Sequence, residues 1–170
     1  MNTKSSMWGT MKRLFFILFF FCIILTSCQG KYGILDYQNK DILAVCTVNG
    51  KYKVEIAKTK ELCKITVQEP ENIKGISFEI GERAYTVYEG VKIESSKESL
   101  DGICALADIF SQSEECLTTA KEEGQGSVLT FQKEECTYKL TIGKNSLPKY
   151  VHILSNSFEY NVEILTIELQ

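Results

Sequence analysis

His152 is the only histidine in the chain, and it is the first residue to consider for acid–base chemistry. It lies between Val151 and Ile153 in an expected strand, so it faces solvent if its two neighbours are buried. A Ser-His-Asp hydrolase of the common α/β type carries its serine in a Gly-x-Ser-x-Gly turn, and this sequence has none. The sequence therefore predicts a surface histidine, no catalytic residue and no enzymatic activity.

Glycines and carboxylates are the next candidates for a ligand site. Gly124-Gln125-Gly126 lacks the further glycine and the following helix of a nucleotide-binding loop, so we interpret it as a turn. Three acidic pairs suggest a glycosidase or a calcium site at first sight: Glu114-Glu115, Glu122-Glu123 and Glu134-Glu135. Neighbouring residues of a strand point to opposite faces, so such a pair does not bring its carboxylates together. We expect solvated charges there.

Cysteines are the remaining chemically active group. Five follow position 40: Cys46, Cys63, Cys104, Cys116 and Cys136. An odd number cannot pair completely within one chain, and no Cys-x-x-Cys spacing marks a redox or zinc motif. We expect buried, reduced thiols that act as small hydrophobic side chains, with a disulfide framework as the alternative. With a single histidine and no ligand cluster, the sequence predicts no metal site and no cofactor.

One further cysteine stands in a modification motif. Leu25, Thr26, Ser27 and Cys28 close an apolar run that follows Lys12 and Arg13. The tetrapeptide resembles the lipobox of bacterial lipoproteins, in which the signal peptide is cut before the cysteine. That resemblance implies a diacylglycerol group and palmitate on Cys28, and a protein anchored in the cell membrane on its extracytoplasmic side.

The apolar run itself fits a signal peptide. Residues 14–25 span about 18 Å as a helix, whereas the hydrocarbon core of a bilayer is roughly 30 Å thick. A basic segment before the run and small residues after it are typical of secretory signals. The start of translation is open between Met1, Met7 and Met11, and the alternative is a buried core helix with Cys28 as an ordinary thiol.

These boundaries predict three parts: a signal peptide (1–27), a lipidated N-terminus and tether (28–40), and one β domain (41–170). Removal of residues 1–27 takes away three basic and no acidic residues, which leaves 16 basic against 22 acidic side chains. This balance argues against nucleic acid or anionic lipid headgroups as partners.

Alternation of apolar and polar residues predicts strands over most of the domain. They are expected at 42–48, 52–57, 62–68, 76–80, 85–88, 91–94, 137–142, 149–154 and 158–169, and the Gly124-Gln125-Gly126 turn separates two further segments, 116–121 and 127–133. Asn49-Gly50 is a type I′ turn signal between the first two. One helix is expected, with Ser99 as its N-cap and an apolar stripe of Leu100, Ile103, Cys104, Ala107 and Phe110. The predicted fold is mainly β: a large curved antiparallel sheet or incomplete barrel of about nine or ten strands, with the helix packed on it.

Short motifs in this pattern carry a family resemblance. They are Pro70-Glu71-Asn72-Ile73-Lys74-Gly75, Tyr88-Glu89-Gly90-Val91, and the Leu147-Pro148 turn before the last two strands. The pattern resembles lipoproteins of clostridia and relatives that are similar to the LolA, LolB and RseB-like outer-membrane lipoprotein carriers. The resemblance implies a half-barrel whose concave face holds acyl chains or an apolar partner segment.

Nine apolar residues are the candidate lining of such a groove, with ordinary core packing as the alternative interpretation: Tyr52, Val54, Ile56, Ile65, Val67, Ile76, Phe78, Tyr85 and Val87. Two functions follow. The first is a membrane-anchored, non-catalytic module that binds a lipid or other apolar ligand. The second is a structural or regulatory envelope protein with a filled core, which acts through contacts with partner proteins that the sequence does not identify.

Overall fold

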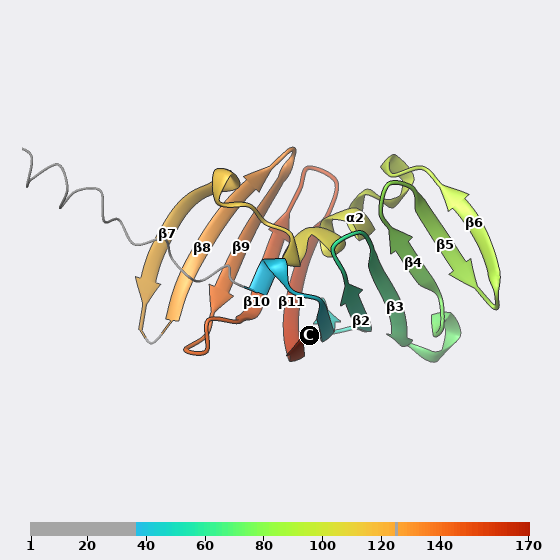
Figure 1. The fold of residues 1–170 in the computed structure, drawn as a ribbon, viewed down its shortest axis with the longest axis horizontal. Coiled ribbons are helices and arrows are strands. Elements are labelled where there is room, and N and C mark those ends of the chain that lie inside the picture. Colours follow the sequence, from blue (N-terminus) through green and yellow to red (C-terminus); the bar gives the residue numbers. More distant parts are fainter. Residues whose placement is uncertain (1–36, 125) are drawn as a thin grey trace, which may run out of the picture. The chain divides into compact units, whose positions relative to one another are not determined.

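The computed structural model describes residues 37–124 and 126–170. Within these residues eleven strands form one antiparallel sheet in the order β6-β5-β4-β3-β2-β1-β11-β10-β9-β8-β7 (Figure 1). The strands are β1 (Ile42–Val48), β2 (Tyr52–Lys58), β3 (Cys63–Glu69), β4 (Ser77–Ile80), β5 (Ala84–Tyr88), β6 (Val91–Ser95), β7 (Leu117–Glu123), β8 (Gly126–Lys133), β9 (Cys136–Ile142), β10 (Pro148–Leu154) and β11 (Glu159–Leu169). The predicted mainly β fold class, one large curved antiparallel sheet with a main helix, is confirmed, with eleven strands in place of nine or ten.

The sheet consists of two meanders joined at their first and last strands. The first meander runs outward from β1 to β6, and the second returns inward from β7 to β11. The two meet where β1 pairs with β11, from Ile42 opposite Leu169 to Val48 opposite Val162. Residues more than one hundred positions apart in sequence therefore lie side by side at the centre of the sheet.

The hairpin between β1 and β2 forms where the sequence predicts it. Asn49 and Gly50 both have positive φ angles, 51° and 63°, as a type I′ turn requires. The side chain of Asn49 also fixes the turn to β11, because its Oδ1 accepts a hydrogen bond from the Asn161 N–H at 2.7 Å. The turn thus sets the register of β1 with β2 and ties the hairpin to the other meander.

A helical segment links the two meanders and covers part of one face of the sheet. It consists of a 3-10 turn (Glu98–Leu100), helix α2 (Asp101–Ala107) and a second 3-10 turn (Asp108–Phe110). The prediction of Ser99 as the N-cap is wrong, because α2 begins at Asp101, its N-cap is Leu100, and the Ser99 N–H donates to Ser96 Oγ. The 3-10 turn after α2 has three residues per turn instead of the 3.6 of an α-helix. Its side chains therefore leave the spacing of the predicted stripe, and Ile109 is buried as well as Phe110.

The core lies between this helical segment and the inner face of the sheet. Alternate residues of β1, β2, β3, β9 and β10 are buried, as the pattern of β1 illustrates: every second residue from Ile42 to Val48 is buried. Full burial of one such aliphatic or aromatic side chain contributes about 1.5–3 kcal/mol. An ion pair adds a polar link, since Lys133 Nζ of β8 lies 2.7 Å from Asp108 Oδ2 of the helical segment.

The packed domain begins earlier than expected. Tyr37 is 2 % exposed and its ring contacts Phe110 edge-on, with ring centroids 6.4 Å apart. Residues 37–39 form a short 3-10 turn. The predicted tether (28–40) therefore ends before Tyr37, and its residues 28–36 lie outside the described residues.

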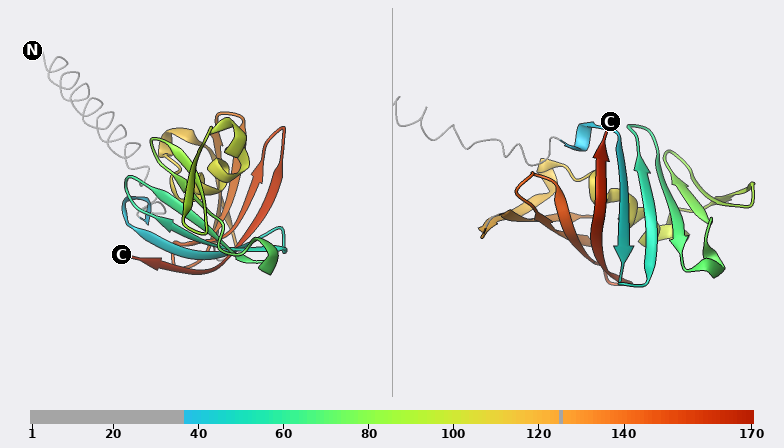
Figure 2. Two further views of the ribbon diagram at one scale, coloured as in Figure 1. Left: turned by 90° about the vertical axis from the view of Figure 1, so that its right-hand side faces the viewer. Right: turned by 90° about the horizontal axis from the view of Figure 1, so that it is seen from below.

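Irregular pairing accompanies the curvature of the sheet. The registers shift between Val45 and Cys46 in β1, between Lys53 and Val54 in β2, and between Pro148 and Tyr150 in β10. An extra residue on one strand of a pair bends that strand and increases its twist. Figure 2 shows the sheet bending around the helical segment, so the face that carries the helix is the concave one.

Candidate functional site

Four of the nine candidate groove residues lie in the filled core. Val54, Ile56, Ile65 and Val67 point to the concave face, but their exposed fractions are between 0 and 8 %. The helical segment covers this part of the sheet, and α2 packs against β3 and β4. These side chains belong to the core, as the alternative interpretation had it, and do not reach solvent.

Two of the nine lie on the opposite face of the sheet. Ile65 pairs with Phe78 and Phe78 pairs with Thr86, so Thr86 shares the concave face. Tyr85 and Val87 flank Thr86 and point to the outer face instead. Both are among the predicted lining residues because β5 carries apolar residues on both faces, and alternation alone does not choose between the faces.

The outer position of Tyr85 is visible in its contacts. Lys92 Nζ lies 4.1 Å from the centre of the Tyr85 ring and 2.6 Å from Glu79 Oε2.

The remaining three candidates, Tyr52, Ile76 and Phe78, are exposed or half-buried. Of these, Tyr52 and Phe78 lie on the concave face: Tyr52 is opposite Val48 at the start of β2, and Phe78 is near the open end of the first meander.

An apolar surface remains open on the concave face at this end, beyond β4. Tyr88 is 45 % exposed, and Val91 and Ile93 are each 60 % exposed. Tyr88 pairs with Val91, and Ile93 pairs with Thr86, which places all three on the face of Phe78. We call Phe78, Tyr88, Val91 and Ile93 the hairpin patch. It is an exposed continuation of the core face.

The strand that carries Val91 and Ile93 is predicted from the sequence, but these two residues are not among the nine predicted lining residues. The signal was present, because they alternate with Lys92 and Glu94 and so define an apolar face. The sequence does not show how far the helical segment covers the concave face of the sheet. That depends on contacts between segments far apart in sequence.

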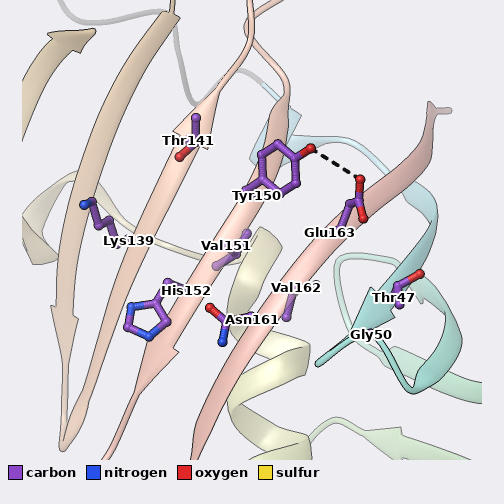
Figure 3. A pocket seen from close by; sticks show the side chains of 10 residues that line it. All are labelled: Thr47, Gly50, Lys139, Thr141, Tyr150, Val151, His152, Asn161, Val162 and Glu163. Carbon is purple, nitrogen blue, oxygen red and sulfur yellow. Dashed lines mark hydrogen bonds between the residues drawn. The ribbon is translucent and has the colours of Figure 1, made fainter.

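A shallow polar depression of about 520 Å³ lies on the outer face, across β1, β9, β10 and β11 (Figure 3). Its walls include Lys139, Thr141 and Asn161. The Tyr150 hydroxyl donates to Glu163 Oε1 at 3.3 Å, and His152 Nε2 lies 2.9 Å from Glu159 Oε1. These groups offer hydrogen bonds on the outer face of the sheet. His152 is at the surface, as the sequence predicts, and no serine or cysteine nucleophile lines the depression.

The thiols are poorly suited to nucleophilic chemistry. Burial raises the pKa of Cys46 to about 12 and that of Cys63 to about 12, although the nearby Lys58 ammonium lowers the latter in part. Burial also raises the pKa values of Cys104 and Cys136. A reactive cysteine needs a lowered pKa, so these four behave as neutral apolar groups. All five cysteines between residues 37 and 170 carry free thiols.

The lipobox residues Leu25, Thr26, Ser27 and Cys28 lie outside the described residues, as does the apolar run before them. Among the residues that the structure describes, no helix has the length and apolar character needed to cross a membrane. In the same residues, no three or more His, Cys, Asp or Glu side chains group as ligands for a metal ion.

Comparison with known proteins finds no matching family model and no matching curated protein. Among solved structures, an uncharacterized conserved protein from Thermus thermophilus is similar, with a TM-score of 0.51 and 12 % identity over 84 % of this chain and 88 % of that one. This similarity concerns the fold alone.

A second solved structure is the LolA superfamily protein NE2245 from Nitrosomonas europaea. Its TM-score is 0.37, with 9 % identity over 81 % of this chain and 92 % of that one. A TM-score below 0.5 does not establish a shared fold, so a relationship to the LolA family remains a hypothesis drawn from the sequence.

Proposed function

We propose that this chain is a membrane-anchored extracytoplasmic lipoprotein that binds a lipid or another apolar ligand on the concave face of its sheet, without catalysing a reaction. The observation that carries the ligand-binding part is the hairpin patch. Val91 and Ile93 are mostly exposed on the same face that elsewhere forms the core. An apolar surface that continues a core and lies open to solvent fits an acyl chain or an apolar segment.

The position of the patch refines the ligand site that the LolA-like resemblance implies. The middle of the concave face is filled by the helical segment, so an apolar ligand has access at β5 and β6. Lys92 and Glu94 lie on the other face and leave the patch uncharged. The apolar contact thus extends from Phe78 at the edge of the core to Ile93 at the edge of the sheet.

A paired substitution tests this site. We expect Val91→Ser with Ile93→Ser to weaken binding of a fluorescent fatty acid about tenfold or more, because each lost apolar side chain removes contact area worth about 1.5 kcal/mol or more when buried. Leu154→Ser is the matched control, since Leu154 is an exposed apolar residue on the outer face of β10. Equal weakening by both variants would contradict a site at the hairpin patch.

Native mass spectrometry identifies the class of ligand. Residues 29–170, purified without detergent from the envelope of the host, are expected to carry an extra mass in the lipid range that is lost on denaturation. A clean apo mass, together with no binding of the fluorescent fatty acid, would favour the second function. That function is a structural or regulatory role through protein contacts, and the filling of the core around Ile56 and Ile65 supports it.

The anchor needs its own test. We expect Cys28→Ala to abolish incorporation of labelled palmitate and release the protein from the membrane, because the lipid is attached to that sulfur and two acyl chains are enough for stable anchoring. Cys116→Ala, which removes a half-buried thiol of the folded domain, is expected to keep both. Labelling and membrane retention in Cys28→Ala would overturn the lipobox assignment.

A further inference from the structure

Strand β6 forms one open end of the sheet. It is hydrogen-bonded to β5, and no strand of residues 37–124 and 126–170 pairs with its other side (Figure 1). Its first four residues are exposed. An exposed edge strand with apolar side chains is a template for pairing with another strand.

The turn before β6 determines which backbone groups are free. Glu89 and Gly90 have φ angles of 48° and 81°, so β5 and β6 are joined by a two-residue turn of the I′ type. The pair that closes such a turn, Tyr88 with Val91, is hydrogen-bonded, and bonded pairs then alternate along the ladder. The N–H and C=O groups of Lys92 and Glu94 consequently point away from β5.

From this we infer that β6 pairs antiparallel with β6 of a second copy of this chain, with Ile93 on the two-fold axis. In that register Lys92 of each copy lies opposite Glu94 of the other, and the free backbone groups of both residues face each other. Ile93 meets its own counterpart as the non-hydrogen-bonded pair between them. Each copy then contributes the same strand, β6, to the interface, as two-fold symmetry requires.

Charge complementarity supports a second copy as the occupant. Within one copy, Lys92 Nζ lies 2.6 Å from Glu79 Oε2, and Arg83 Nη1 lies 3.3 Å from Glu94 Oε2. Pairing about Ile93 places Lys92 of one copy between its own Glu79 and the other copy's Glu94, which is already beside Arg83. The charges along the outer face of the junction then alternate in sign, and opposite charges directly across a ladder are favourable.

The other open end of the sheet lacks this property. Strand β7 is also exposed, but self-pairing about Ala120 sets Thr119 opposite Lys121 and Thr118 opposite Glu122. No pair of opposite charges results, and Leu117 meets Glu123. Self-pairing about Glu122 sets Lys121 opposite Glu123, but it also sets Glu122 opposite its own counterpart, which is a like-charge pair. The β6 register about Ile93 has only attractive charge pairs, and neither of these β7 registers does.

Disulfide trapping tests the register in the full chain at the membrane. Cα atoms of a non-hydrogen-bonded antiparallel pair are about 4.5 Å apart, which is within the range of a disulfide. We expect Ile93→Cys to give a dimer on a non-reducing gel after oxidation with copper phenanthroline. Thr119→Cys, an exposed residue of the β7 edge, is the matched control and should remain monomeric. Equal trapping of both, or of neither, would overturn the inference.

Charge reversal separates dimerisation from damage to the fold. We expect Lys92→Glu and Glu94→Lys each to weaken self-association about tenfold, since each turns two attractive pairs into two repulsive ones. The two variants mixed together restore both attractive pairs, so differently tagged full-length copies should co-purify as strongly as wild type. Any local damage is the same alone and in the mixture. No recovery on mixing would refute this register.

This inference does not depend on the proposed ligand. Lys92 and Glu94 lie on the outer face, so the charge reversals leave the hairpin patch apolar. If the mixed variants recover while the fluorescent fatty acid binds nowhere, the dimer stands and the ligand proposal fails. If the fatty acid binds at the patch and neither trapping nor mixing gives a dimer, the dimer fails alone.

Discussion

The buried thiols of Cys46 and Cys63 give the protein a definite pH dependence. Both have pKa values of about 12 in the folded chain, against an ordinary value of 9.0, because burial disfavours the thiolate. A raised pKa stabilises the fold fully below the unfolded value and loses that effect as pH rises. The free energy of unfolding is therefore expected to fall between about pH 9 and pH 12. Burial raises the phenol pKa values of Tyr37 and Tyr138 as well, with the same sign.

Urea unfolding measured from pH 7 to pH 11 checks this prediction. Cys46→Ala should reduce the loss of stability at high pH, because it removes one of the titrating groups. In parallel, iodoacetamide at pH 8 should leave Cys46 and Cys63 unmodified until the chain unfolds. Rapid alkylation of either cysteine in the native protein would contradict their assignment as buried neutral thiols.

Phe110 lies at the end of the helical segment and belongs to the core between that segment and the sheet. It is fully buried, and Tyr37 contacts its ring. We expect Phe110→Ala to lower the free energy of unfolding by about 3–5 kcal/mol, because it leaves a large cavity. Leu154→Ala, at an exposed position, should change the free energy by less than about 0.5 kcal/mol. Comparable effects of the two substitutions in urea denaturation would argue against the packing of the helical segment described above.

The facing of individual residues was predictable only where one face of a strand is clearly apolar. In β2 the alternation of Val54 and Ile56 with charged residues assigns the inner face correctly. In β5, Tyr85 and Val87 lie on the outer face although Tyr88 lies on the inner one, and no charged residue breaks the tie. For such a strand the face follows from the register with β4, which the sequence does not state.

At the scale of elements, the close approach of α2 to β11 makes a specific prediction. A Cβ atom at Gly102 would collide with the hydroxyl of Tyr160, whose ring stacks on Phe158 at a centroid distance of 5.0 Å. Gly102→Ala is expected to destabilise the protein by about 1–3 kcal/mol, as overpacking of a tight contact does.

A double-mutant cycle isolates this contact. Tyr160→Phe removes the hydroxyl, so Gly102→Ala should cost about 1 kcal/mol less in that background than in the wild type. Thermal and urea unfolding of the four proteins measure the difference. A cost of Gly102→Ala that is independent of Tyr160 would place the strain elsewhere, for example in the start of α2.

Most of the strands could be predicted from the sequence, but the exact residues at which the elements begin and end could not always be predicted. Turn signals such as Asn49-Gly50 delimit the strands within one or two residues, because these residues favour backbone angles that few others adopt. The helix was less well defined. Seven residues of α2 flanked by 3-10 turns do not keep one period, so the predicted stripe missed Leu106 and Ile109, which are buried.

At the scale of the whole molecule, the pairing of β1 with β11 could not be predicted from the sequence. Burial alternates along β1, and along β11 up to Ile164, but such a pattern says which residues share a face and not which strand lies alongside. The chain closes this central pair only when its last strand arrives. Such long-range pairing is typical of slowly folding β proteins.

The two meanders are therefore expected to remain associated without a covalent link between them. A protease site inserted between Ser113 and Glu114, both exposed, allows the folded full-length chain to be cut after purification. The two pieces should elute together on gel filtration, because the β1–β11 ladder and the shared core hold them. Val162→Asp puts a charge into that core and should separate the pieces or prevent folding, since Val162 is buried between β1 and β10. Asn161→Asp introduces the same side chain one residue earlier, on the outer face, and should leave the pieces together. The contrary outcome is that the chain with the inserted site folds, but its two pieces separate after cleavage even without the Val162→Asp substitution. In that case the helical connection, and not the β1–β11 ladder, holds the two halves of the sheet together.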